Sequence, residues 1–255
     1  LCGTNITDNT AEANGGGICT SKRTNKGVDY YTNITMTGGK VSGNETGGSG
    51  GGFLLQSFTT MTLKDGIIEN NHTGKDGAGV YVSTNCTFHM EGGQIRNNNA
   101  DRNGGGLYNY KCTANYNSGS ITDNTALNGG GGMVMTGQGY VINMGEGMVI
   151  TGNTALNGGA IVVQGRVTLN MENVDLNDNR ATTGNGGAIY LSTNSFLNIK
   201  GGSITNHSCD GYGGAIFSTT NSTLNIDGLV MKNNKAGYGG AMSLGGTVNL
   251  TNSTV

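Results

Sequence analysis

Hydrophobic and polar residues follow a pattern along this chain that recurs about every 27 residues. In each repeat an aliphatic residue stands three places before an Asn and five before a small residue, as in Ile121, Asn124 and Ala126. A Gly-Gly pair and an apolar residue then follow, as in the segment that leads to Ile189. Because a fixed period of this length is typical of solenoids and propellers, we expect neighbouring repeats to bury each other's apolar residues.

Each repeat contains three short alternating segments that predict strands. In the first, Leu224 and Ile226 face inward while Asn225 faces outward. The second is the aliphatic-x-x-Asn segment, and the third is Gly-Gly-Ala-Ile-Tyr-Leu at 186–191. Three strands per coil predict an all-β fold, a right-handed parallel β-helix of about nine to ten coils. We expect residues 1–255 to form this single domain, as an excerpt of a longer chain.

The Asn of each repeat is expected to point inward and to stack at one corner of the coil. An amide carries both a donor and an acceptor, so stacked Asn residues can satisfy one another where the backbone turns. His207 occupies one of these positions, where a ring nitrogen is expected to replace the amide. The predicted ladder consists of Asn9, Asn44, Asn71, Asn98, Asn124, Asn153, Asn179, His207 and Asn234.

The five Cys residues divide into three groups. Cys209 falls in a small inward position and is expected to be a buried free thiol. Cys86 and Cys112 occupy the same column on neighbouring coils. Stacking places their α-carbons about 4.8 Å apart, which is within the range of a disulfide. A bridge between this pair is therefore possible, whereas Cys2 and Cys19 cannot be assigned.

Composition narrows the range of partners. The chain has 49 Gly, no Pro and no Trp, and its net charge is −2 with 12% charged residues. Without Pro, no residue interrupts a backbone ladder through the repeats. A charge this small gives no basic surface for nucleic acid or anionic lipid, and no apolar run is long enough for direct membrane insertion.

The column after the first strand is where a polysaccharide-active β-helix enzyme would carry converging carboxylates. Here opposite charges alternate: Lys64 stacks with Glu91, and Lys200 stands between Glu172 and Asp227. This arrangement predicts surface ion pairs rather than a catalytic cluster. The three His residues lie on different columns or distant coils, so neither a metal site nor any other cofactor is expected.

The outward face of the first strand carries a row of Thr and Asn residues. Such an array on a rigid solenoid could bind an ordered surface such as ice or a glycan, although a solvated β face chosen for strand propensity is the more common explanation. The row consists of Thr35, Thr62, His89, Asn115, Asn143, Asn170, Asn198, Asn225 and Asn249.

The first coil carries an insertion of charged and aromatic residues. Loops that protrude from one face of a solenoid are its usual contact points, so this insertion is a candidate partner-binding loop. Its candidate residues are Lys22, Arg23, Lys26, Asp29, Tyr30 and Tyr31.

Two tetrads carry a resemblance to a known family. Gly-Gly-Ala-Ile occurs at 158–161, 186–189 and 213–216, and Phe-x-x-Asn occurs with an aliphatic residue in place of Phe. At these motifs the chain resembles the polymorphic outer membrane protein repeats of chlamydial and related adhesins. The resemblance implies a β-helical passenger exposed at the cell surface that adheres to host or neighbouring cells, and no catalytic residues carry over.

These observations predict a non-enzymatic structural or adhesive segment of an extracellular or cell-surface protein. Its expected partners are other protein chains or cell-surface glycans, with end-to-end self-association into a fibre or continuation in a longer chain. The alternatives are a polysaccharide-active lyase or hydrolase and an ice- or crystal-binding module.

Overall fold

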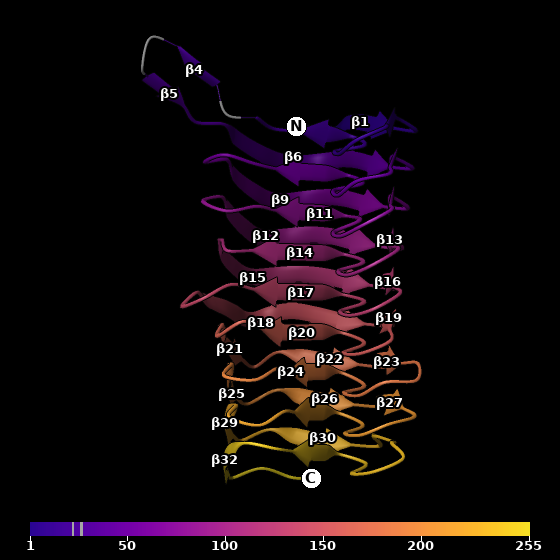
Figure 1. The fold of residues 1–255 in the computed structure, drawn as a ribbon, viewed down its shortest axis with the longest axis vertical. Coiled ribbons are helices and arrows are strands. Elements are labelled where there is room, and N and C mark those ends of the chain that lie inside the picture. The colour runs from indigo at the N-terminus through magenta and orange to yellow at the C-terminus, as the bar shows by residue number, and fades with distance from the viewer. Residues whose placement is uncertain (22, 26–27) are drawn as a thin grey trace.

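The computed structural model is a rod of stacked β-coils with its two termini at opposite ends (Figure 1). It describes residues 1–21, 23–25 and 28–255. Every strand pair between coils is parallel, and the coils wind in the right-handed sense that parallel crossovers favour. The predicted right-handed parallel β-helix is therefore confirmed. The described part of the chain contains no helix that could cross a membrane.

The first sheet contains one long strand or two short strands from each coil. Its main path runs through β1 (Thr4–Thr7), β6 (Asn33–Ser42), β9 (Thr60–Glu69), β12 (Thr87–Arg96), β15 (Thr113–Thr122), β18 (Val141–Thr151), β21 (Thr168–Glu172), β25 (Phe196–Lys200), β29 (Thr223–Asp227) and β32 (Thr247–Thr251). A second row, beside the later strands, continues from β18 through β22 (Asp175–Asn177), β26 (Ser203–Thr205) and β30 (Val230–Lys232).

The other two sheets complete each coil. The second sheet is made of β2 (Thr10–Ala11), β7 (Glu45–Thr46), β10 (His72–Thr73), β13 (Asn99–Ala100), β16 (Thr125–Ala126), β19 (Thr154–Ala155), β23 (Arg180–Ala181) and β27 (Ser208–Cys209). The third is made of β3 (Ile18–Cys19), β8 (Phe53–Leu55), β11 (Val80–Val82), β14 (Leu107–Tyr110), β17 (Met133–Thr136), β20 (Ile161–Gln164), β24 (Ile189–Leu191), β28 (Ile216–Ser218) and β31 (Met242–Leu244).

The coils differ from the expected division in two respects. The two segments predicted as separate strands form one continuous strand from β6 to β18 and separate only from β21 onward. Where those two segments form one strand, the short strand of the second sheet, which follows the Asn corner, brings the coil to three strands. In the described ranges, eight coils contribute to all three sheets, the ninth lacks a strand in the second sheet, and the tenth is β32 alone. The complete turns therefore number eight, fewer than the nine to ten coils predicted.

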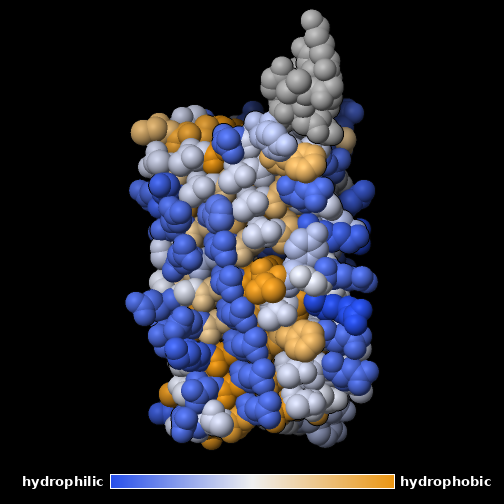
Figure 2. All heavy atoms as spheres, turned by 90° about the vertical axis from the view of Figure 1, so that its left-hand side faces the viewer, coloured by the Kyte–Doolittle hydropathy of each residue, from blue (hydrophilic) through white to orange (hydrophobic). Residues whose placement is uncertain are grey.

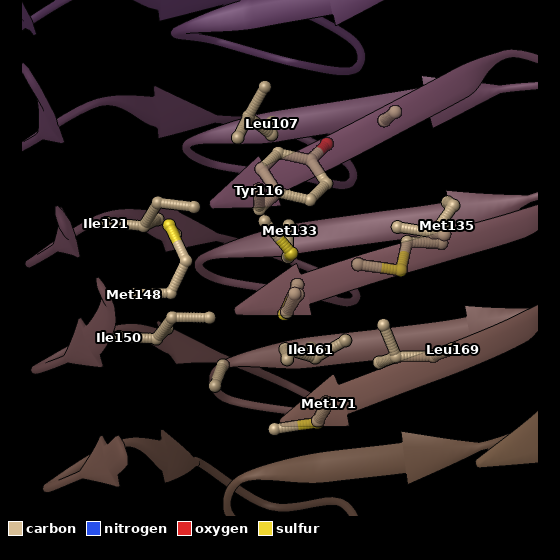
Figure 3. Packing of buried hydrophobic residues seen from close by; sticks show 14 of the residues in the cluster. Leu107, Tyr116, Ile121, Met133, Met135, Met148, Ile150, Ile161, Leu169 and Met171 are labelled. Carbon is tan, nitrogen blue, oxygen red and sulfur yellow. The ribbon is translucent and has the colours of Figure 1, made fainter. Parts of the chain in front are cut away.

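The core follows directly from the alternation of the sequence. In β25, Leu197 and Ile199 are 0% and 3% exposed, and they stack in register on Leu224 and Ile226 of the next coil. The same stacking of inward side chains continues through the middle of the rod (Figure 3). Like residues therefore lie over like residues, which keeps the cross-section constant from coil to coil.

An interior column, made of the predicted ladder residues, satisfies the backbone at the corner of each coil. The side-chain amide of Asn124 donates to Oδ1 of Asn153 at 3.0 Å and to the carbonyl of Ile95 at 2.9 Å. Its backbone N–H donates to the same Oδ1 at 2.9 Å. Asn124 and Asn153 are both 0% exposed. The predicted inward Asn ladder is thus present and buried from Asn44 to His207, where it saturates groups that water cannot reach, whereas Asn234 is partly buried and Asn9, in the first coil, is exposed.

His207 reproduces the amide contacts with its ring. Nδ1 accepts a hydrogen bond from the backbone N–H of Asn179 at 2.9 Å, and Nε2 lies 3.1 Å from the carbonyl of Leu176, to which it must donate. These partners require the neutral tautomer with its proton on Nε2. Burial lowers the pKa of His207 to about 4, so the ring is neutral near pH 7.

The residue before each interior-column position adopts a left-handed backbone conformation, with φ between 53° and 68°. Gly adopts this conformation freely, and Asn and Asp tolerate it better than other residues. The sequence obeys this restriction in every coil. The residues are Asp8, Gly43, Asn70, Asn97, Asp123, Gly152, Asp178, Asn206 and Asn233.

Candidate functional site

A second column of amides lies on the outside of the rod. We call it the exterior column; it consists of Asn115, Asn143, Asn170, Asn198, Asn225 and Asn249. From Asn170 onward, each Nδ2 donates to Oδ1 of the preceding coil at 2.8 Å, and Asn143 reaches Asn115 at 3.2 Å. Figure 2 shows a hydrophilic column along this face of the rod, with hydrophobic surface beside it toward the C-terminal end.

The exterior amides keep unused hydrogen-bonding capacity. An Asn side chain has two N–H donors and two acceptor lone pairs. In the middle of the column, Asn198 uses one donor toward Asn170 and one lone pair toward Asn225. Neither interaction involves the backbone. One N–H and one lone pair of Asn198 therefore remain for solvent or a ligand, since no other partner contacts this side chain among the residues described.

A furrow runs beside the exterior column where the first sheet separates into two rows. It has a volume of about 500 Å³ and spans the coils from β18 to β32. Its floor is formed by inward residues that alternate with the column, including Met171, Ile199 and Ile226, which are 2–3% exposed. Its second wall is the outward row that follows them, including Glu172 and Lys200.

The charges of this second wall are paired or hydrogen-bonded. Lys200 Nζ lies 3.2 Å from Glu172 Oε1, with both side chains largely exposed. Asp227 accepts hydrogen bonds from Thr251 Oγ1 at 2.7 Å and Asn252 Nδ2 at 2.8 Å, and these contacts lower its pKa. The predicted pairing of Lys200 with Glu172 is found, but Asp227 takes hydroxyl and amide partners instead.

Two other sets of charged side chains form ion pairs between neighbouring coils. Lys64 Nζ lies 3.5 Å from Glu91 Oε2, as the alternating charges predicted. Glu69 is nearly buried and receives Lys40 Nζ at 2.6 Å and Arg96 Nε at 2.8 Å. The hydrogen bond from Lys40 lowers the pKa of Glu69 more than burial raises it, so this carboxylate holds three successive coils together in its ionised form. In the described ranges, no group of three or more His, Cys, Asp or Glu is arranged to hold a metal.

Comparison with known proteins identifies one stretch of the chain. Residues 173–192 match the Chlamydia polymorphic membrane protein repeat. The matched stretch contains β22, β23 and β24, and with them Asn179 of the interior column and the tetrad at 186–189. Over these residues the chain is similar to that repeat, and its fold is a parallel β-helix. No curated protein sequence and no solved structure gave a significant match.

The family match also bears on location. Polymorphic membrane proteins are associated with the outer membrane and the cell surface, which supports a cell-surface location in general terms. The match covers a single repeat, and the remaining coils share its geometry.

The buried cysteines lie where the repeat places them. Cys209 is 5% exposed, which confirms its predicted burial. Cys86 and Cys112 immediately precede the paired residues Thr87 and Thr113, and both are 2% exposed. Their thiols are free, so the disulfide is not formed in this structure and remains a prediction. Burial raises the pKa of Cys112 to about 12, which makes it a poor nucleophile.

The predicted partner-binding loop forms an antiparallel hairpin of β4 (Arg23–Asn25) and β5 (Val28–Tyr30). Figure 1 shows these two strands projecting from the body of the rod near its N-terminal end. Arg23, Asp29 and Tyr30 belong to the hairpin strands, whereas Lys22 and Lys26 lie outside the described residues. Tyr31 is 67% exposed and packs edge-to-face on Phe58 at 5.8 Å. The hairpin therefore remains a predicted contact point, far along the rod from the furrow.

Sequence reasoning identified the exterior column but not the furrow beside it. The outward Asn residues were visible from alternation alone. The furrow depends on the separation of β21 from β22, and no composition change marks that point. The left-handed column was also missed, although its signal is present in the sequence, since every one of its residues is Asp, Asn or Gly.

Proposed function

We propose that this chain is a non-enzymatic adhesive segment of a large extracellular or cell-surface protein. The observation that carries the proposal is the repeat match to polymorphic membrane proteins within a regular β-helix. In such a solenoid, each coil contacts only its neighbours, so added coils lengthen the rod without changing its cross-section. This architecture suits a scaffold that holds contact surfaces away from a cell.

The proposed partners are other protein chains and cell-surface glycans. We further propose that another coil, from the same chain or from a second copy, covers the C-terminal end of the rod. Leu244 and Leu250 occupy inward columns but are 39% and 44% exposed. Apolar side chains in these positions favour end-to-end contact.

The charges of the furrow support the non-enzymatic proposal over a polysaccharide-active enzyme. General acid catalysis needs a carboxyl group that holds a proton near the working pH. Hydrogen bonds instead favour the ionised form of Asp227, and Glu172 is paired with Lys200. The two acidic residues are therefore arranged as surface ion-pair and hydrogen-bond partners.

Adhesion of coated beads to cultured animal cells tests the proposal. Beads carrying the segment are expected to adhere in a saturable manner, and soluble segment should compete with them. Beads carrying a globular protein of similar size and net charge are the control. Adhesion no greater than that control would contradict the proposal. Depolymerisation of a polysaccharide panel that is lost on Glu172→Gln and Asp227→Asn substitution would instead support an enzyme.

A further inference from the structure

We propose that the furrow beside the exterior column binds a linear, uncharged polysaccharide that lies along the rod axis. The proposal rests on the adhesive function proposed above and names the chemistry of one partner. It is argued from the hydrogen-bonding capacity of the column, the pairing of the strands beneath it, and the charge and floor of the furrow.

The exterior amides are not needed to build a coil. The same register position holds Thr35, Thr62 and His89 in the earlier coils, which have the same strand pairing. The interior column, by contrast, hydrogen-bonds to backbone carbonyls in almost every coil. The fold therefore does not require the amides from Asn115 to Asn249. Their free donors and acceptors face outward.

The spacing of these groups suits a repeating ligand. Adjacent strands lie about 4.8 Å apart, so the column from Asn143 to Asn249 presents amides over roughly 19 Å. Asn170, Asn198 and Asn225, which have an amide neighbour on both sides, each offer one free N–H and one free lone pair. A sugar hydroxyl is both a donor and an acceptor, as the Ser and Thr hydroxyls are, so a chain of sugars can meet an amide at successive coils.

The strand pairing disfavours an extended peptide as the ligand. Peptides commonly bind a sheet by adding a strand to an unpaired edge. Here β21 pairs with β18 and β25, and β29 pairs with β25 and β32. The furrow therefore offers side-chain groups along its length. In the region that the structure describes, its strands up to β29 have no free edge, and the free edge of β32 lies at the end of the furrow.

The charge and the floor of the furrow favour an uncharged ligand. Glu172 and Lys200 neutralise each other at 3.2 Å, which leaves Asp227 as the excess charge of this wall. One residual negative charge gives no attraction for a polyanion and little for a polycation. The floor residues Met171 and Ile199 are apolar and only 2–3% exposed, so the floor adds no charged or polar partner for an ionic ligand.

Affinity electrophoresis against purified soluble polysaccharides tests the proposal. The panel contains neutral glucans, mannans and galactans, with polygalacturonate as the anionic comparison. We expect the chain to be retarded by at least one neutral polymer. The triple variant Asn170→Ala, Asn198→Ala, Asn225→Ala should weaken that binding about tenfold or more, because three hydrogen-bonding groups are removed. The matched control, Thr35→Ala with Thr62→Ala, changes the same register position in earlier coils, outside the furrow, and should bind normally.

The outcomes separate this proposal from the adhesive function. Retardation by none of the neutral polymers, retardation by polygalacturonate alone, or equal loss of binding in both variants would overturn the furrow site. Circular dichroism and thermal unfolding establish that the triple variant is folded. If the triple variant still adheres to cells on beads, the furrow is not the adhesive contact and only the adhesive function survives. If wild-type beads do not adhere but the neutral polymer still binds, the adhesive function fails and the furrow site stands.

Discussion

The interior and exterior columns use the same residue at the same spacing for different purposes. Asn124 lies at a corner where backbone groups leave the sheet, and it contacts both a neighbouring amide and the carbonyl of Ile95. Asn198 lies on a paired strand and contacts only amides of its own column. An Asn stack is therefore structural where it replaces missing backbone partners, and it is available for binding where the backbone is already satisfied.

The largest effect is expected from Asn124→Leu. The substitution removes an acceptor shared by the backbone and side-chain N–H groups of Asn98, and it leaves the carbonyl of Ile95 without its donor. Several buried polar groups would lose their partners at once, so the free energy of unfolding should fall by about 3 kcal/mol or more. Urea denaturation followed by circular dichroism measures the change.

The matched control for this substitution is Asn143→Leu in the exterior column. It should lower the free energy of unfolding by less than about 1 kcal/mol, since the groups that lose a partner are exposed to water. Equal losses for the two variants would contradict the distinction between the columns.

The pH dependence of the free energy of unfolding tests whether the His207 ring, which replaces an amide in the interior column, stays neutral. The pKa of His207 falls from about 6.5 to about 4 on folding, so the unfolded chain binds more protons between these values. Stability from this residue is therefore complete above pH 6.5 and is lost as pH falls toward 4. The loss should reach about 1.5 kcal/mol at pH 5.5 and about 3 kcal/mol below pH 4.

The variant His207→Asn isolates this contribution from other titrating groups. Asn can accept from Asn179 and donate to the carbonyl of Leu176, as the other column members do in their own coils. The difference in unfolding free energy between wild type and variant should then increase as pH falls from 7 to 4. A constant difference across this range would show that the buried ring does not resist protonation.

A smaller effect on stability is expected from the triple exterior variant Asn170→Ala, Asn198→Ala, Asn225→Ala. Exposed cross-strand side-chain pairs contribute a few tenths of a kcal/mol each, so the combined loss should be about 1 kcal/mol. Thermal unfolding measures it. A loss as large as that of Asn124→Leu would mean that the exterior amides also support the coil, which would remove the argument that they are free for binding.

The smallest effect is expected from Lys200→Met, which removes the ion pair with Glu172. Both side chains are largely exposed at 75% and 63%, so water and salt screen their attraction. The free energy of unfolding should change by no more than about 0.5 kcal/mol, measured by urea denaturation at low and at high salt. A loss above about 2 kcal/mol would make this wall of the furrow a structural element rather than a surface.

The fold could be predicted because one coil repeats the constraints of the next. Alternation fixed which of Leu224 and Asn225 faces inward, and the recurring Asn fixed the corner. The division of the first sheet could not be predicted in the same way. Ile68 stands six positions after Thr62 in continuous β9, and Ile204 stands six positions after Asn198 across the break between β25 and β26.

The furrow could therefore not be predicted from the spacing of residues in the sequence. Its existence depends on how the backbone bends between Lys200 and Ser203, and the same Gly-rich composition serves a bulge in one coil and a turn in another. Likewise, the partners of Asp227 depend on where Thr251 and Asn252 stand in the tenth coil. Local patterns identify which side chains face outward, whereas the shape between them is a property of the stacked coils.

The orientation of the strands has a mechanical consequence. They lie across the rod, so the hydrogen bonds between coils run along its length, and a pull on the two ends loads these bonds one coil at a time. A detached coil of about 27 residues extends to roughly 90 Å, against about 4.8 Å while it is stacked. A tether of this kind would lengthen under tension in equal steps and absorb work at each one. The coils still stacked would keep their outer surfaces intact, so a bound partner could be held while the tether yields.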